Sequence, residues 1–383
     1  MGAFSGSLNT NEIFAALYNM IISQQVFADN LGKKQTLVDK ARVDGSLYGD
    51  TKLYYATDAL KSSAWGNDSE AANLLSLDRP DAPECQAIAI DQFRQIRLTI
   101  DNYLTKRAWS TETAFSDFNS VMLGWIGNTK DIYDGTLYNA FIGTNVSAEA
   151  AQNISKSLTS GKEAQEIAET IANLLVDMGD FRREFNDYKN LRSYAKDSIK
   201  IIWNAKYVNM VKYIDLPTIF HAERLEQHFT EDILPARYFG TVITASNVST
   251  YSDSTPAAGK PIDSDNGQYT PGSNNANGCV RSLVEKTYTI SSTTYHVFPG
   301  DELQATATIG ASSTNFLYGE VYIEDPKVIC KVVVKLPPYM SAFSVATSFF
   351  NARSLTETHY LTFGHNSLEH LKNYPYITIK QSN

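Results

Sequence analysis

One helical pattern runs for roughly 30 residues, beginning at the candidate N-caps Ser110 and Thr111 and the acidic first-turn residue Glu112. At 1.5 Å per residue such a helix is about 45 Å long, more than one compact domain usually needs. Gly124 and Gly127 are candidate bending points. Apolar side chains recur at helical spacing along one wide face: Phe115, Phe118, Val121, Met122, Trp125, Ile126, Ile132, Tyr133, Leu137 and Phe141.

The chain before this helix predicts a long two-stranded ribbon. Apolar residues alternate at Ile88, Ile90, Ile96, Leu98 and Ile100, and a partner strand is expected within Leu47–Leu60. The polar stretch Trp65–Pro83 lies between the two. Because two strands alone are marginally stable in water, the ribbon is expected to pack on a partner subunit. Its candidate contact residues are Leu53, Tyr54, Tyr55 and Trp65, with internal core positions as the alternative.

The N-terminal segment is almost uncharged. Glu12 is the single charged residue from Met1 to Ala28, and apolar side chains follow at helical spacing. Two interpretations remain open: a first helix packed on the core, or an arm lying along a neighbouring subunit. The candidate contacts of the arm are Phe14, Leu17, Ile21 and Phe27, which are equally compatible with an internal core.

A second amphipathic helix is expected from Lys162 to Tyr188. Its inward residues would be Ile167, Ile171, Leu174, Leu175, Met178, Phe181 and Phe185, and its solvated outer face would carry Asp180, Arg183, Glu184 and Asp187. Residues 244–278 are polar and rich in turn formers, which predicts a surface insertion. A further helix is expected at Ala222–Leu234. Strands are expected at Ile199–Trp203, Tyr207–Leu216, Tyr238–Ile243, Val284–Ile290, Tyr295–Phe298, Leu303–Ile309, Val321–Ile323, Val328–Val334, His359–Phe363 and Ile377–Lys380.

Composition and motifs argue against several functions. A net charge of −9, from 33 basic and 42 acidic residues, disfavours a phosphate-gripping or sequence-reading role. Cys85, Cys279 and Cys330 are too far apart for a metal site. The apolar run Ile13–Ile22 is too short to span a membrane, and we expect no membrane association. No nucleotide-binding, hydrolase or zinc-protease motif occurs, and His221 and His228 lack further ligands at suitable spacing. We therefore expect no catalytic residue, cofactor or metal.

The order of these elements resembles the Hong Kong 97 capsid fold of tailed bacteriophages. Particular segments also look like capsid proteins of podoviruses and related gut phages. They are Met20–Phe27 followed by Gly49–Leu53, then Leu225 and Phe229 followed by Tyr238–Ile243, and Asn351, Arg353 and Leu355 leading into His359–Phe363. The resemblance implies an α+β fold with an N-terminal arm (1–35), an extended loop (36–108), a spine helix of the peripheral domain (109–145), an axial domain (146–318) and a return to the peripheral domain (319–383).

The resemblance also implies a function. The chain would be a major capsid protein that self-assembles through pentamers and hexamers into an icosahedral head. That head would enclose double-stranded DNA without reading its sequence, after assembly in the cytoplasm of a bacterial host. Scaffolding, portal and other head proteins would be its partners. The alternatives are another virion structural protein, such as a tail or portal-associated protein, or a cytoplasmic enzyme without a readable motif.

Overall fold

The computed structural model describes twelve segments of the chain. These are residues 37–43, 51–61, 79–101, 112–145, 153–208, 230–243, 286–290, 293–297, 307–308, 315–316, 321–341 and 343–382.

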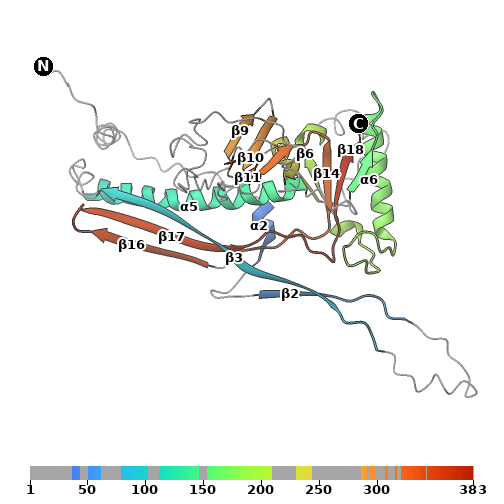
Figure 1. The fold of residues 1–383 in the computed structure, drawn as a ribbon, viewed down its shortest axis with the longest axis horizontal. Coiled ribbons are helices and arrows are strands. Elements are labelled where there is room, and N and C mark those ends of the chain that lie inside the picture. Colours follow the sequence, from blue (N-terminus) through green and yellow to red (C-terminus); the bar gives the residue numbers. More distant parts are fainter. Residues whose placement is uncertain are drawn as a thin grey trace, which may run out of the picture.

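A long helix and a four-stranded sheet lie side by side (Figure 1). The helix α5 spans Glu112–Gly143, 32 residues, which confirms the predicted long helix. The sheet has the order β16-β17-β3-β2, with bounds Phe343–Asn351, Thr356–Asn366, Glu84–Asp101 and Thr51–Ala56. Ile126 and Tyr133 of α5 pack with Ile96 of β3 and Phe363 of β17. This cluster fixes the helix to one face of the sheet.

The buried face of α5 is narrower than the apolar pattern predicts. Trp125 and Ile132, both expected on that face, are 60% and 40% exposed. Successive helical residues point about 100° apart, so Trp125 cannot share the direction of the buried Ile126. The helix continues through both glycines that were candidate bending points.

Strand β3 changes its partner one third of the way along its length. Its first six residues, Glu84–Ala89, pair with β2, and the rest, from Ile90 to Asp101, pairs with β17. A register shift between His365 and Asn366 lies at the end of the β17 pairing. The expectation of an unsupported ribbon is therefore wrong for the longer part of β3, because β17 and β16 widen the sheet there.

A second sheet has the order β5-β18-β14-β6-β7. Its strands span Asn153–Lys156, Tyr376–Gln381, Val328–Val333, Lys200–Asn204 and Thr230–Leu234. Every residue of β14 is buried, as in a strand covered on both faces. The helix α6, Glu163–Gly179, packs on this sheet through Ile167, Ile171 and Met178. The strands β14 and β18 come from the segment expected to return to the peripheral domain, yet they pair with β6 and β5.

The predicted helix Lys162–Tyr188 is too long by nine residues, because α6 ends at Gly179. Met178 is its last buried residue, and Asp180 already has extended backbone. Phe181, expected inward, is 68% exposed, whereas Phe185 packs against the core from a loop. The helix ends where the amide of Asp180 donates to the carbonyl oxygen of Asp177 and the backbone turns extended. The predicted outer-face residues Asp180, Arg183, Glu184 and Asp187 consequently belong to this loop.

A third sheet has the order β4-β8-β13-β10-β9. Its bounds are Thr144–Asn145, Gly240–Ile243, Val321–Glu324, Thr293–Val297 and Lys286–Ile290. Ala140 of α5 packs with Tyr238, Val242 and Tyr322 at this sheet, while Tyr138 and Ile142 contribute to a core shared with the second sheet. The long helix therefore contacts all three sheets.

The remaining described elements are short. The helix α2 (Leu37–Ala41) leads into β1 (Arg42–Val43), which pairs in parallel with β15 (Tyr339–Met340). A separate antiparallel pair is formed by β11 (Ala307–Thr308) and β12 (Asn315–Phe316). Single 3₁₀ turns span Lys196–Ser198 and Ala236–Tyr238. Residues 37–43 were expected within the extended loop, but Leu37, Val38 and Ala41 are buried beside α5.

Other local expectations differ from the structure. Tyr207 and Val208, expected in a strand, are helical, and residues 230–234, expected at the end of a helix, form β7. Residues 230–234 form a strand because each of them pairs with a residue of β6. Strands β5 and β16 were not predicted. The N-terminal arm, most of the expected helix Ala222–Leu234 and the insertion 244–278 lie outside the described residues.

Gly143 has no room for a side chain, since a Cβ there would lie 2.0 Å from the carbonyl oxygen of Tyr238. We expect Gly143→Ala to lower the free energy of unfolding by about 2 kcal/mol, because the backbone must move. Gly135→Ala in the same helix is the matched control, since its Cβ would have no neighbour within 4 Å. That change should raise the stability by about 0.5–1 kcal/mol. Urea unfolding measures both, and equal effects would contradict the expectation.

Candidate assembly surfaces and the junction behind them

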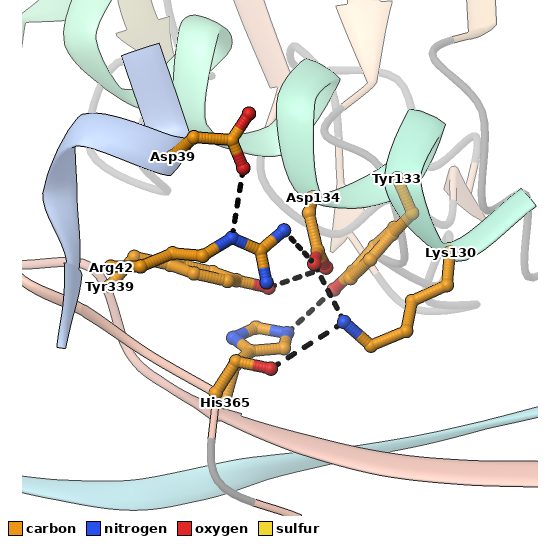
Figure 2. Close-up of polar contacts among 8 residues, drawn as sticks. Asp39, Arg42, Lys130, Tyr133, Asp134, Tyr339 and His365 are labelled. Atoms are coloured by element: carbon orange, nitrogen blue, oxygen red, sulfur yellow. Dashed lines mark hydrogen bonds and ion pairs between the residues drawn. The ribbon is translucent and has the colours of Figure 1, made fainter. Parts of the chain in front are cut away.

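A buried polar junction joins the described N-terminal segment to the long helix (Figure 2). Its centre is Asp134 of α5, whose side chain has no exposed surface. The carboxylate lies 2.7 Å from Lys130 Nζ and 3.2 Å from Arg42 Nη2, and the Tyr339 hydroxyl donates to it at 2.6 Å. Arg42 also pairs with Asp39 at 3.1 Å. The junction thus fastens α2 and β1 to α5 and β15.

The junction extends to β17 through a buried histidine. The Nδ1 of His365 lies 2.9 Å from the carbonyl oxygen of Asn366, so that nitrogen donates, and Nε2 accepts from the Tyr133 hydroxyl at 2.7 Å. Burial lowers the pKa of His365, which keeps the ring neutral at neutral pH. Burial and the neighbouring Asp134 carboxylate raise the pKa of Tyr339. Tyr339 therefore stays protonated and donates its hydrogen bond.

This arrangement holds elements together and offers no access to a substrate. Asp134 is enclosed by groups of its own chain, and Tyr133 and Tyr339 are 1% and 0% exposed. A buried carboxylate is stable only when it is paired and hydrogen-bonded, and the junction meets both conditions. We interpret it as the brace that keeps the neighbouring surfaces in one relative position.

A second buried charge braces the end of α5. Lys331 of β14 is fully buried, and its Nζ donates to the carbonyl oxygen of Thr144 at 2.6 Å and to the Tyr376 hydroxyl at 3.2 Å. That hydroxyl in turn lies 3.3 Å from the carbonyl oxygen of Ile142. A positive charge is favourable at a helix C-terminus, where carbonyl groups lack helical partners. Lys331 therefore links the long helix to the middle of the second sheet.

The candidate contacts on β2 divide between the two faces of the ribbon. Leu53 and Tyr55 are 51% and 64% exposed, and they lie opposite Ala87 and Cys85 of β3 in the register. Residues opposite one another in an antiparallel pair share a face. Ala87 and Cys85 are exposed as well, so the outer face of the ribbon is an uncharged, largely apolar surface.

Tyr54 points to the opposite face of the ribbon and contacts its own chain. The Nζ of Lys335 lies 5.4 Å from the centre of the Tyr54 ring and 5.5 Å from that of Tyr374. Partial burial, with Tyr374 nearby, raises the pKa of Tyr54. The structure thus places this candidate contact against the body of the subunit. The other candidates, Phe14, Leu17, Ile21, Phe27 and Trp65, lie outside the described residues.

The end of the β16–β17 hairpin is an additional exposed apolar region. Phe349, Phe350 and Leu355 are 62%, 52% and 44% exposed, and the adjacent Phe349 and Phe350 of β16 project from opposite faces of the sheet. Sequence reasoning missed it because β16 was not predicted, although two adjacent phenylalanines before the polar Asn351 were a usable signal. Exposed apolar groups of this size are typical of sites that contact another molecule.

The described part of the chain contains no group of three or more His, Cys, Asp or Glu side chains placed to hold a metal ion. Within the same residues, no helix is long and apolar enough to cross a membrane. Cys330 is buried, and burial raises the pKa of its thiol.

Comparisons with known proteins show the fold. No family model matches the chain, and no curated protein does. A chain in the capsid structure of Staphylococcus phage Andhra superposes with a TM-score of 0.55 at 10% identity, over 100% of this chain and 94% of that chain. A chain in the structure of the head fiber and inner core protein gp22 of native bacteriophage P68 gives 0.54 at 10% identity, over 94% and 89%. The predicted α+β, Hong Kong 97-like capsid fold is confirmed.

Proposed function

We propose that the chain is a major capsid protein that builds the icosahedral head of a tailed double-stranded DNA bacteriophage. One observation carries the proposal: the fold matches a chain of a phage capsid structure over the full length of this chain. A long brace helix shared by three sheets suits a structural subunit, and we propose no catalytic role. The similarity to podovirus and gut-phage capsid proteins in the sequence supports membership of that group as the narrower proposal.

The proposed mechanism is assembly through surfaces that gain burial only beside a neighbour. On the ribbon these are Leu53 and Tyr55, whose exposed apolar faces would be covered by a second copy of the chain. On the N-terminal arm we propose Phe14, Leu17, Ile21 and Phe27. Many weak contacts of this kind can close a stable lattice, because each subunit makes several of them.

The proposed organisation keeps the arm at 1–35, the spine helix at 109–145 and the axial domain at 146–318, which includes the insertion 244–278. Pentamers and hexamers would form in the cytoplasm of the bacterial host with scaffolding, portal and other head proteins. The net charge of −9 suits a wall that encloses DNA without binding its sequence.

The proposal predicts how the full-length chain sediments. Expressed alone or with its scaffolding protein, it should form capsomers or closed particles that sediment far ahead of a 42.5 kDa monomer. Sedimentation velocity measures this directly. A monomer under every condition, with the scaffolding protein supplied, would contradict the proposal.

A further inference from the structure

The ribbon meets the body of the subunit at a loop that follows α6. We call Arg182–Arg192 the docking loop. Its two ends are joined by a β-bridge, with N–O distances of 3.0 and 3.1 Å between Arg182 and Arg192. Inside it, the buried Asn186 donates to the carbonyl oxygen of Asn190 and accepts from the amide of Asn190, both at 2.8 Å. Lys189 adopts a left-handed backbone (φ 56) to close the turn. The docking loop therefore holds its shape through its own contacts.

The docking loop binds the two residues that follow β2, Thr57 and Asp58, through three groups. Arg183 Nη1 lies 2.5 Å from Asp58 Oδ2, and the amide of Leu191 donates to Asp58 Oδ1 at 2.9 Å. Arg192 Nη2 donates to the carbonyl oxygen of Thr57 at 2.6 Å. Both oxygens of the Asp58 carboxylate are thus bound by one loop.

The docking loop itself helps to orient the side chain of Arg183. The same Nη1 donates to the carbonyl oxygen of Lys189 at 2.8 Å, so the loop orients the guanidinium. The amide of Leu191 and the guanidinium of Arg183 lower the pKa of Asp58 to about 2. The folded-state pKa of Asp58 lies below its usual value. The stabilisation that the ionised carboxylate gives the folded protein is therefore present above about pH 4 and is lost only as the pH falls toward about 2. Mild acidification would leave the contact intact.

The other strand of the ribbon is held from the same side. The side chain of Gln86 donates to the carbonyl oxygen of His370 and accepts from the amide of Lys372, both at 3.0 Å. His370 in turn lies 2.7 Å from Asp187 of the docking loop. The docking loop and residues 370–372 therefore form one platform under both strands.

The ion pair between Arg183 and Asp58 is exposed to solvent and can therefore be broken without unfolding the subunit. The side chains of Arg183 and Asp58 are 51% and 37% exposed, and ion pairs with that much solvent contact are individually weak and screened by salt. The contact at Gln86 differs, because Gln86 is 6% exposed. The strand β3 is thus held at a buried site, whereas the chain just beyond β2, whose last residue Ala56 is 2% exposed, is held at a solvent-accessible charge pair.

We propose that Asp58 and the docking loop form a releasable latch that sets the direction in which the ribbon leaves the body, with Gln86 as the fixed point. Its consequence for the shell rests on the proposed function: release at Asp58 would let the ribbon change direction toward a neighbouring subunit without unfolding the body.

The latch can be tested by hydrogen exchange on the full-length, unassembled protein carrying Asp58→Asn. Exchange in residues 51–59 and at the Leu191 amide should become about fivefold faster, while α6 and β14 exchange as in the parent chain. Asp81→Asn, at an exposed position shortly before β3, is the matched control, because it removes the same charge outside the docking loop contact. Parent-like exchange at Leu191 in Asp58→Asn would overturn the latch.

The salt dependence of hydrogen exchange is a second measurement, and it separates the loss of a charge pair from a loss of packing. Raising the ionic strength should speed exchange at Leu191 in the parent chain and should have little further effect in Asp58→Asn. Equal salt sensitivity in the two proteins would also overturn the proposal. Because both measurements use unassembled protein, they judge the latch alone, whereas failure to form particles would count only against the proposed function.

Discussion

Asp134→Ala is expected to lower the free energy of unfolding by about 3 kcal/mol. The change removes the shared partner of Lys130, Arg42 and Tyr339, which lie 2.7, 3.2 and 2.6 Å from the carboxylate. Lys130 is only 14% exposed and would lose its compensating charge. Urea unfolding followed by circular dichroism measures the loss.

Glu169→Ala is the matched control for Asp134→Ala, because it also removes an acid from a helix but at an exposed position of α6. It should change the stability by less than about 0.5 kcal/mol. If the two variants unfold alike, Asp134 does not brace the subunit.

The double change Leu53→Glu and Tyr55→Glu is expected to abolish particle formation while leaving the subunit folded. Both side chains are more than half exposed, so the unassembled chain can solvate the new charges. An interface that covers this face would have to bury two carboxylates without partners, which is strongly unfavourable. Sedimentation and circular dichroism together separate assembly from folding.

Val176→Glu controls for the added charge, because Val176 is 63% exposed and lies on α6, outside the ribbon. Particles should form normally from this variant. Normal particles from the ribbon double variant would show that the outer face of the ribbon is not an intersubunit contact.

The sequence was most informative where one periodicity persists over many residues. The helix α5 and the alternating β3 were both predicted, because long runs average out local exceptions. The apolar stripe of α6 was also correct up to Met178. The helix ends at Gly179, and the apolar residues Phe181 and Phe185, which extend its pattern in the sequence, belong to the following loop.

Tertiary pairing decided the elements that sequence reasoning missed. Residues 230–234 carry a helix-like pattern but form β7, because β6 supplies a partner for each of them. The strand β16 alternates Phe343, Val345, Thr347 and Phe349 with small residues, a strand pattern that sequence reasoning overlooked, and it pairs with β17 along its length. Neither partner can be found from local sequence.

The candidate site was only partly predictable. Leu53 and Tyr55, named as intersubunit contacts, are exposed on the ribbon, and their contact with a neighbour stays a prediction. Period-two geometry alone would have placed Tyr54 on the opposite face. The junction at Asp134 carried little signal: Lys130 and Asp134 are an i,i+4 pair, which usually lies on a solvated helix face. Its burial depends on Arg42 and Tyr339, which are distant in the sequence.

Electron microscopy of the purified full-length protein, prepared with its scaffolding protein, tests the central claim most directly. The proposed function predicts closed icosahedral shells whose walls show pentamers and hexamers of this chain. Rings or tubes would indicate another virion component, and featureless monomers would contradict a capsid role altogether.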